Sequence, residues 1–404
     1  MNPKANGLEA QTEFCDTAQF ETAIRTPLTA VAIAIHQIRQ DEREGTAVAT
    51  DWLSIDPNHP TDPTHILLPD GSRFHGRGAN IHDTRSCDAC TTVSPPNVGE
   101  VLRRIDELVD VWGANFLRLV LESYAADGGF RKHWMGVLDD PGYLAELQAI
   151  VSHIGSKPGV WVLLSLWADP TFTPSQDPNR PPDPTKPEGG WPTLVPIPPN
   201  LHSTKEVWEK LASTFAMDSH VLLGICNEPK RNSDGTRDAE VWTAMNAVVD
   251  IMRAAEAAAG APQQHVIAVQ GTRDWARALD YYVANPITAG GGTNIVYETH
   301  IYNPQPDFKA LFEDPALTLP VIIGEFGPQP DPTMGPVMTL ADCDALMASA
   351  RALEIPHLGW TFHHNCDPSM LTNNSGDPPT CGAGMLLAPT DWGKHVKAGL
   401  NIPW

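Results

Sequence analysis

The chain has 404 residues, enough to bury a large core, and its 42% apolar and 7% aromatic content is that of a globular protein rather than a disordered one. No apolar run reaches the roughly 18 residues that a membrane-spanning helix needs. The 27 basic and 49 acidic residues give a net charge of −22, which argues against nucleic acid or an anionic membrane as a partner and fits a neutral substrate.

The first part of the chain is predicted to lie apart from the main domain. Residues 1–60 form an N-terminal extension with some helical periodicity over 27–38, ending in a proline-rich connector at Pro57 and Pro60. Residues 61–404 are expected to form one domain. At its start, residues 65–74 are typical of a hairpin with Asp70-Gly71 at the turn.

Short apolar runs then alternate with helical patterns along the whole domain. The expected strands are 76–82, 115–121, 160–167, 220–226, 265–270, 294–300, 320–325 and 357–362, and the expected helices are 98–112, 143–154, 205–215, 239–259, 275–282, 340–353 and 392–400. Such alternation predicts parallel βα units. The eight strands close into an α/β fold of the (β/α)8 TIM-barrel type, whose active site lies at the carboxyl ends of the strands.

Two of the predicted strands end in a glutamate. The stretch Gly224-Ile225-Cys226-Asn227-Glu228-Pro229 follows one apolar run, and Gly324-Glu325-Phe326-Gly327 ends another. A carboxylate at the end of a buried strand is costly unless it has a partner or a chemical role. A salt bridge would explain either acid alone, but two at the ends of two parallel strands suit glycoside hydrolysis, in which one acid protonates the leaving oxygen and the other attacks or activates water.

These two motifs resemble the catalytic strands of glycoside hydrolase family 5, the cellulase-type retaining glycanases. The resemblance covers roughly residues 68–400 and is specific at strands two, four, six, seven and eight. It implies that Glu228 is the general acid/base and that Glu325 is the nucleophile that forms a glycosyl-enzyme ester. It implies no cofactor and no metal.

The resemblance also assigns four residues around the two glutamates. Asn227 would bond the sugar 2-hydroxyl, and His300 would lie near the acid/base. Arg118, in an apolar strand, would pair with the nucleophile, and Tyr302 would hydrogen-bond to it. Both contacts are expected to lower the pKa of the nucleophile. Glu298 is assigned to a structural ion pair.

Four further residues are candidates for contact with the sugar. Trp360 matches the strand-eight tryptophan that stacks under the sugar in the family. Trp167 stands where many cellulase-type members have a histidine at the end of strand three, and His82 at the end of strand one could supply the missing imidazole. The proline-rich stretch 170–200 is too long for an ordinary connection, so it either walls the cleft, with Trp191 as its best stacking residue, or is an ordered loop without substrate contact.

The seven cysteines are expected to form loop disulfides, which implies an oxidising compartment. Cys87 and Cys90 lie in one loop, and Cys366 and Cys381 bracket another, while Cys226 is expected to be a buried free thiol. No leader segment is visible, so secretion would require one removed ahead of Met1.

Three classes of function are open at this stage. The favoured one is a retaining, monomeric and secreted endo-β-1,4-glucanase acting on a β-linked polysaccharide or oligosaccharide, with a β-mannanase, a mixed-linkage glucanase or an exo-β-glucosidase as alternatives on the same barrel. A non-catalytic carbohydrate-binding barrel is the second class, although it would not need both glutamates. A zinc-stabilised structural protein built on Cys87 and Cys90 is the third.

Overall fold

The computed structural model of the chain divides into two compact units, Met1–Thr50 and Asp51–Trp404. It describes residues 52–85, 97–122, 136–168, 191–196, 202–229, 232–332, 335–364, 366–372 and 386–404. The unit boundary lies earlier than the predicted one near residue 60, because Ser54 pairs with Leu67 and Ile55 with Asn294 of the barrel. The predicted helical segment 27–38, Cys87 and Cys90 lie outside the described residues.

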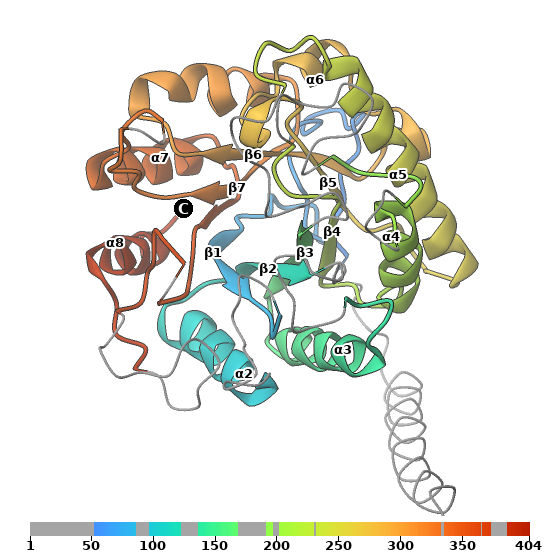
Figure 1. Cartoon of the computed structure of the whole chain (residues 1–404). Helices are drawn as coiled ribbons and strands as arrows, with labels where there is room; N and C mark the ends of the chain where they lie inside the picture. The colour runs from blue at the N-terminus through green and yellow to red at the C-terminus, as the bar shows by residue number, and fades with distance from the viewer. Residues whose placement is uncertain are drawn as a thin grey trace, which may run out of the picture. The chain divides into compact units, whose positions relative to one another are not determined.

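The second unit is a closed barrel of eight parallel strands in chain order, which confirms the predicted fold (Figure 1). The strands are β1 (Arg77–His82), β2 (Phe116–Glu122), β3 (Trp161–Ala168), β4 (Val221–Gly224), β5 (Ile267–Gln270), β6 (Ile295–Ile301), β7 (Val321–Phe326) and β8 (His357–Gly359). Side chains of the described strand residues are almost all buried, as expected for a parallel sheet covered on both sides.

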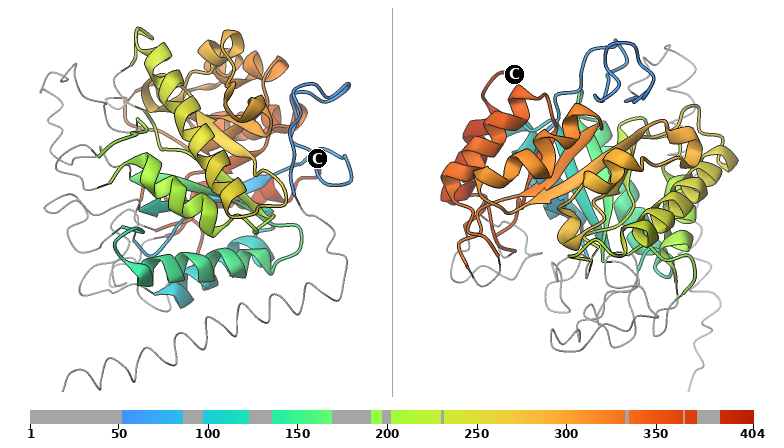
Figure 2. Two further views of the ribbon diagram at one scale, coloured as in Figure 1. Left: turned by 90° about the vertical axis from the view of Figure 1, so that its right-hand side faces the viewer. Right: turned by 90° about the horizontal axis from the view of Figure 1, so that it is seen from above.

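Helices cover the outside of the barrel, and α4 and α5 lie side by side on it (Figure 2). The α-helices are α2 (Val98–Asp106), α3 (Pro141–Gly155), α4 (Thr204–Thr214), α5 (Asp238–Ala258), α6 (Asp280–Ala284), α7 (Leu340–Ala352) and α8 (Asp391–Leu400). The π-helices are η2 (Glu107–Val111) and η6 (Lys309–Glu313), and the 3-10 turns are η3 (Asp274–Ala276), η4 (Ala289–Gly292), η5 (Gln305–Asp307) and η7 (Pro315–Leu317).

The sequence encodes several of these helix starts directly. Ser203 and Glu206 form a capping box at the start of α4, and Thr339 and Asp342 form one at the start of α7. Each box satisfies backbone N–H groups that the first helical turn leaves without partners. The helices therefore begin close to where the sequence predicts them.

The predicted hairpin closes the amino-terminal end of the barrel. Gly71 occupies the turn with φ of 82°, and Phe74 N–H donates to the Ile66 carbonyl at 2.8 Å. The apolar side chains of this segment pack with the lower interior of the barrel in one cluster, which includes Leu53, Ile55, Ile66, Phe74, Phe116, Trp161, Leu163, Leu222, Val296 and Ile322. With this end filled, polar side chains can gather only at the opposite, carboxyl end of the strands.

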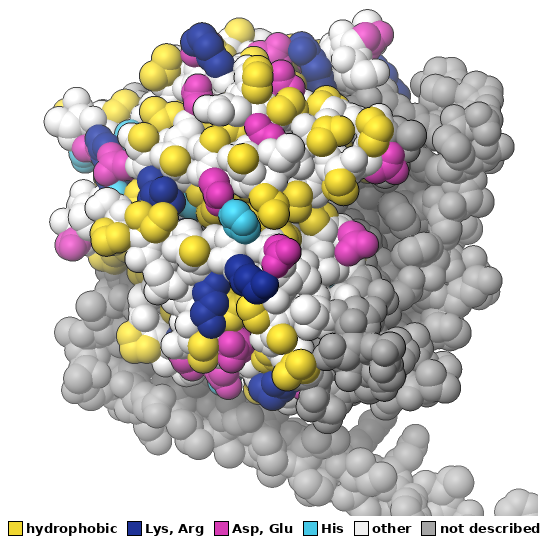
Figure 3. All heavy atoms as spheres, turned by 90° about the vertical axis from the view of Figure 1, so that its left-hand side faces the viewer, with side chains coloured by type: hydrophobic (Ala, Val, Ile, Leu, Met, Phe, Trp, Pro, Cys, Tyr) yellow, Lys and Arg dark blue, Asp and Glu magenta, His cyan; other side chains and the backbone are white. Residues whose placement is uncertain are grey.

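The outer surface carries both signs of charge. On the face shown in Figure 3, acidic and basic side chains are interspersed rather than gathered into one patch. Ion pairs such as Lys394–Asp391 and His395–Asp344 accompany α7 and α8. Within the described residues, no helix is both long and apolar enough to cross a membrane.

Cys366 is disulfide-bonded, whereas Cys226 and Cys343 are free and buried. We predict Cys381, which lies outside the described residues, as the partner of Cys366. Alkylation in denaturant without reductant should label Cys226 and Cys343, and peptide mapping should recover Cys366 and Cys381 as one cross-linked species. A cross-link from Cys366 to any other cysteine, or none, would contradict the pairing.

Candidate active site

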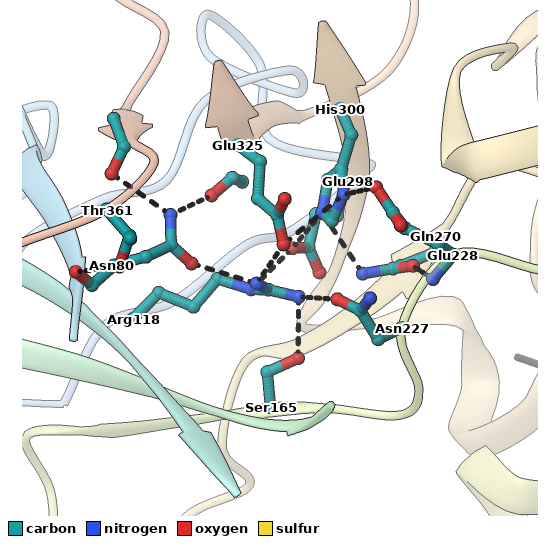
Figure 4. A network of polar contacts seen from close by, with 12 residues as sticks. Asn80, Arg118, Ser165, Asn227, Glu228, Gln270, Glu298, His300, Glu325 and Thr361 are labelled. Carbon is teal, nitrogen blue, oxygen red and sulfur yellow. Dashed lines mark hydrogen bonds and ion pairs between the residues drawn. The ribbon is translucent and has the colours of Figure 1, made fainter. Parts of the chain in front are cut away.

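The two predicted glutamates meet at the carboxyl end of the barrel (Figure 4). Glu228 follows β4 and its side chain is 16% exposed, whereas Glu325 lies in β7 and its side chain is 5% exposed. One carboxylate oxygen of each glutamate and a ring nitrogen of His300 all lie within 4.8 Å of one another. His300 lies between the two acids, with its Nδ1 3.0 Å from Glu228 Oε1 and 3.5 Å from Glu325 Oε1.

The backbone of Glu228 is held in an unusual conformation. Its φ is 52°, in the left-handed region that residues with a side chain rarely adopt. The side-chain Oε1 of Gln270, the last residue of β5, accepts a hydrogen bond from the backbone N–H of Glu228. This hydrogen bond fixes the turn after β4 and aims the Glu228 carboxyl group at His300.

Glu325 is held by two hydrogen-bond donors. Arg118 Nη1 donates to its Oε1 at 2.6 Å, and the Tyr302 hydroxyl donates to its Oε2 at 3.0 Å. His300 lies on the Oε1 side as well. These contacts fix the orientation of the carboxylate and favour its charged form, as a nucleophile requires.

Arg118 connects the strands beneath the two acids. From β2 it donates to Asn80 Oδ1 at 2.8 Å, Ser165 Oγ at 2.8 Å and Asn227 Oδ1 at 2.7 Å, and its Nε lies 2.9 Å from Glu298 Oε1. A guanidinium only donates, so the Oδ1 of Asn227 must face it and the amide nitrogen must point elsewhere. Asn227 is thereby oriented to donate outward, as its predicted contact with a sugar hydroxyl requires.

The electrostatics of Glu325 differ from the sequence-based expectation. Burial raises the pKa of Glu325, and the positive charges of His300 and Arg118 with the Tyr302 hydrogen bond offset it only in part. The net direction is upward, whereas the sequence predicts a lowered pKa from Arg118 and Tyr302. The difference arises because the sequence reveals the charged partners but not the complete enclosure of the carboxyl group.

His300 and Glu298 form a buried ion pair under the reacting acids. Burial alone would lower the pKa of His300, but the charge of Glu325 and hydrogen bonds to Glu228 and Glu298 raise it to about 9. Burial would raise the pKa of Glu298, but Arg118 and His300 bring it below its ordinary value. Both shifts favour the charged form of the group concerned.

Glu228, His300 and Glu325 are also the side chains in the active site that could bind a metal ion. In the part of the chain that the structure describes, Glu228, His300 and Glu325 are the one set of acid and histidine side chains compact enough to hold an ion. The Arg118 guanidinium lies 2.6 Å from Glu325, and a divalent cation beside it would meet like charge. The set fits acid–base chemistry better than metal binding.

Two of the predicted sugar-contacting residues pack together at the neighbouring rim. The rings of His82 and Trp360 meet edge to face with centroids 5.3 Å apart, and His363 lies 4.8 Å from His82. The backbone N–H of Trp360 donates to the carbonyl of Phe326, the residue after Glu325, at 2.8 Å. Trp360 therefore lies next to the nucleophile strand, where the predicted platform would be, but Trp360 is only 5% exposed and His82 is fully buried.

Of the long loop predicted over 170–200, the structure describes residues 191–196. Trp191 is 3% exposed, belongs to the main hydrophobic core and carries the Arg237 guanidinium over its ring at 4.1 Å. The core position and the guanidinium on its ring argue against the predicted stacking role of Trp191. The side chain of Trp167 and most of residues 170–200 lie outside the described residues.

Sequence reasoning missed Asn80, Ser165, Gln270 and Trp275. The first three are polar residues in apolar strands, and that placement is the one signal that could have revealed them. Trp275 lies in η3 after β5, is 43% exposed and has a φ of 64°. Its backbone N–H donates to the carbonyl of Pro229, the residue after Glu228, at 3.1 Å, so the backbone of this exposed tryptophan lies beside the segment that carries the acid/base.

A closed parallel barrel with two carboxylates this close at its carboxyl end defines a glycoside hydrolase. The family model described as "Cellulase (glycosyl hydrolase family 5)" matches residues 75–365, and the chain belongs to that family. A mannan endo-1,4-beta-mannosidase of Streptomyces lividans is 26% identical over 204 aligned positions, and the match covers 48% of this chain and 46% of the relative. That match thus spans about half the length of the curated relative.

Solved structures confirm the fold. The catalytic domain of an endoglucanase from Thermobifida fusca, in complex with cellotetraose, has a TM-score of 0.59 at 19% identity, covering 87% of this chain and 98% of that one. A beta-mannanase from Streptomyces thermolilacinus with mannohexaose has a TM-score of 0.58 at 20% identity, covering 86% of this chain and 94% of that one.

Proposed function

We propose that the protein is a retaining, endo-acting β-1,4-glycanase with β-1,4-glucan as its preferred substrate. The observation that carries this proposal is the approach of the Glu228 and Glu325 carboxylate oxygens to within 4.8 Å around His300. Retaining enzymes hold their carboxyl groups about 5–5.5 Å apart, while inverting enzymes leave about 6.5–9.5 Å for a water molecule.

The mechanism follows from the contacts of each acid. Glu325, aligned by Arg118 and Tyr302, attacks the anomeric carbon as Glu228 protonates the departing glycosidic oxygen. The resulting ester carries no charge, and Glu228, now a carboxylate beside His300, takes a proton from the water that hydrolyses it. Asn227 donates to the sugar 2-hydroxyl, and this contact strengthens in the transition state.

Aromatic residues would hold the chain on either side of the cleavage point. Trp360, beside the nucleophile strand, serves the sugar that becomes attached to Glu325. Trp275, beside the acid/base, serves the sugar that leaves, and its 43% exposure gives it ring area for such contact. Binding on both sides of the bond favours cleavage within a chain over removal of terminal sugars.

Mannan is the second candidate substrate, because the curated relative is named a mannosidase and a structural neighbour was solved with mannohexaose. Glucose and mannose differ at the 2-hydroxyl, the group that Asn227 is proposed to contact. The disulfide at Cys366 supports secretion, because such bonds persist in oxidising compartments.

We expect the enzyme to hydrolyse carboxymethyl-cellulose and barley glucan at least about tenfold faster than mannan or glucomannan, a ratio of the size that one misplaced hydroxyl contact produces. Reducing-end assays with product chromatography give both rate and mode of action. Release of mixed oligosaccharides indicates endo cleavage, whereas release of glucose alone would contradict it. Faster cleavage of mannan would move the assignment to a β-mannanase.

A further inference from the structure

Glu298 lies beneath the two catalytic acids and does not face the space in which a substrate would bind. It is fully buried in β6, and its Oε1 lies 2.9 Å from Arg118 Nε and 3.0 Å from His300 Nε2 (Figure 4). Gly324, next to the nucleophile, leaves it the necessary room, because a Cβ at that position would collide with the Glu298 carboxylate. The glycine of the Gly-Glu-Phe-Gly motif thus accommodates the ion pair below.

Among the described residues, four charged groups act on His300. Glu298 meets its Nε2, Glu228 and Glu325 lie on its Nδ1 side, and Arg118 is the one cation among the described groups that act on it. Gln270 adds a neutral amide 3.3 Å from Nε2. Before catalysis Glu228 carries a proton, so the anions Glu298 and Glu325 are balanced only if both Arg118 and His300 are positive.

The protonation of His300 decides what Glu228 can do. A neutral imidazole that donates from Nε2 to Glu298 presents a lone pair at Nδ1, only 3.0 Å from Glu228 Oε1. That lone pair would accept the acid's proton and draw it away from the substrate. An imidazolium instead donates from Nδ1 to Glu228 and leaves the acid's proton on its other oxygen.

We propose that Glu298 is a positioning residue that holds His300 doubly protonated, so that Nδ1–H donates to Glu228 and the Glu228 proton stays directed at the glycosidic oxygen. The role deepens the proposed function and rests on it for its catalytic consequence. Its electrostatic basis is the set of contacts that His300 and Glu298 make, and the raised pKa of His300 agrees with it.

The first test needs no substrate. Histidine ¹⁵N signals distinguish an imidazolium, with two protonated nitrogens, from a neutral ring, with one. The His300 signals are assigned by their loss in the H300Q variant. At pH 7 we expect two protonated nitrogens in the wild type and only one in E298Q. A singly protonated His300 in the wild type, or a doubly protonated one in E298Q, would overturn the proposal, and the first outcome does not require E298Q to fold.

The second test separates acid catalysis from general damage. We expect E298Q to lower kcat/KM about tenfold or more for cello-oligosaccharides, whose leaving group needs a proton. For dinitrophenyl cellobioside, whose leaving group departs without one, the loss should be much smaller. Equal losses on both substrates would mean that Glu298 is only structural. If the wild type cleaves neither substrate, the proposed function fails, while the ¹⁵N test still decides the state of His300.

The chain provides a matched control. Glu256 of α5 is equally buried and pairs with His265 Nδ1 at 2.6 Å and Arg253 Nη1 at 2.8 Å, in the same Arg–Glu–His combination away from the site. E256Q should lower the unfolding temperature and leave the ratio of the two kcat/KM values unchanged. E298D, which keeps the charge, should retain the doubly protonated His300 and part of the activity on cello-oligosaccharides. Loss of both in E298D would contradict the role of the charge.

Discussion

Replacing Glu325 by glutamine should lower kcat/KM on every β-glycan that the enzyme cleaves by about 10³-fold or more, because an amide cannot form the glycosyl ester. The fold should survive, because Arg118 keeps its contacts to Asn80, Ser165 and Glu298. Steady-state kinetics beside circular dichroism of the same preparation separates the two effects. Hydrolysis within about tenfold of wild type would show that Glu325 is not the nucleophile.

Replacing Glu228 should give a different defect, because its carboxyl group acts on the leaving oxygen. Glu228→Gln should lower kcat/KM for oligosaccharides by about 10²–10⁴-fold, the usual contribution of a general acid. For an aryl glycoside with a good leaving group, kcat/KM should stay close to the wild-type value. The two glutamates can thus be told apart by substrate, although both lie within reach of His300.

Azide gives the independent readout of the two roles. With Glu325→Ala, azide should occupy the vacated space, attack the anomeric carbon and release a glycosyl azide of inverted configuration. With Glu228→Ala, azide should attack the ester on Glu325 and give the retained product. Products of the opposite configurations would exchange the two assignments.

The barrel and the two acids could be predicted from the sequence because both leave local signals. Buried parallel strands are short apolar runs, and a catalytic carboxylate interrupts such a run at its carboxyl end, as Glu228 and Glu325 do. Arg118 is visible for the same reason. Each of these residues is conspicuous in its own strand, whatever the rest of the barrel does.

The supporting residues are not conspicuous in this way. Asn80, Ser165 and Gln270 are small polar interruptions, and their role depends on the register that brings separate strands around one guanidinium or one backbone N–H. That register is a property of the closed barrel and is not written in any one segment.

The two tryptophans show the corresponding limit for loops. The place of Trp191 in a long loop on the catalytic face predicts a stacking residue, but Arg237 from the next loop lies on its ring. Trp275 is 43% exposed and lies in a turn with positive φ at both Trp275 and Ala276. No local preference predicts that backbone, because residues with a Cβ avoid it. Tertiary contacts decide which ring is buried and which is exposed.

The acidic limb of the pH–rate profile should move to higher pH when Arg118 is replaced by methionine. Activity requires ionised Glu325, so the rate falls as the pH drops through the pKa of this carboxyl group. Burial already raises that pKa, and Arg118 at 2.6 Å is one of the charges that oppose the rise. Removing the guanidinium therefore raises the pKa of Glu325 further, and at a fixed pH below the limb each unit of displacement lowers the rate about tenfold.

Two companion variants keep this experiment decisive. Tyr302→Phe removes only the hydrogen bond to Glu325 Oε2 and should move the limb in the same direction by a smaller amount, with the Arg118 contacts intact. Arg253→Met removes a guanidinium that is also buried against a glutamate, at 2.8 Å, but away from the site. It should lower the unfolding temperature and leave the limb in place. An acidic limb that moves in neither Arg118→Met nor Tyr302→Phe would mean that another group sets the charge of the nucleophile, whereas a limb that moves equally in Arg253→Met would reflect lost stability rather than lost charge.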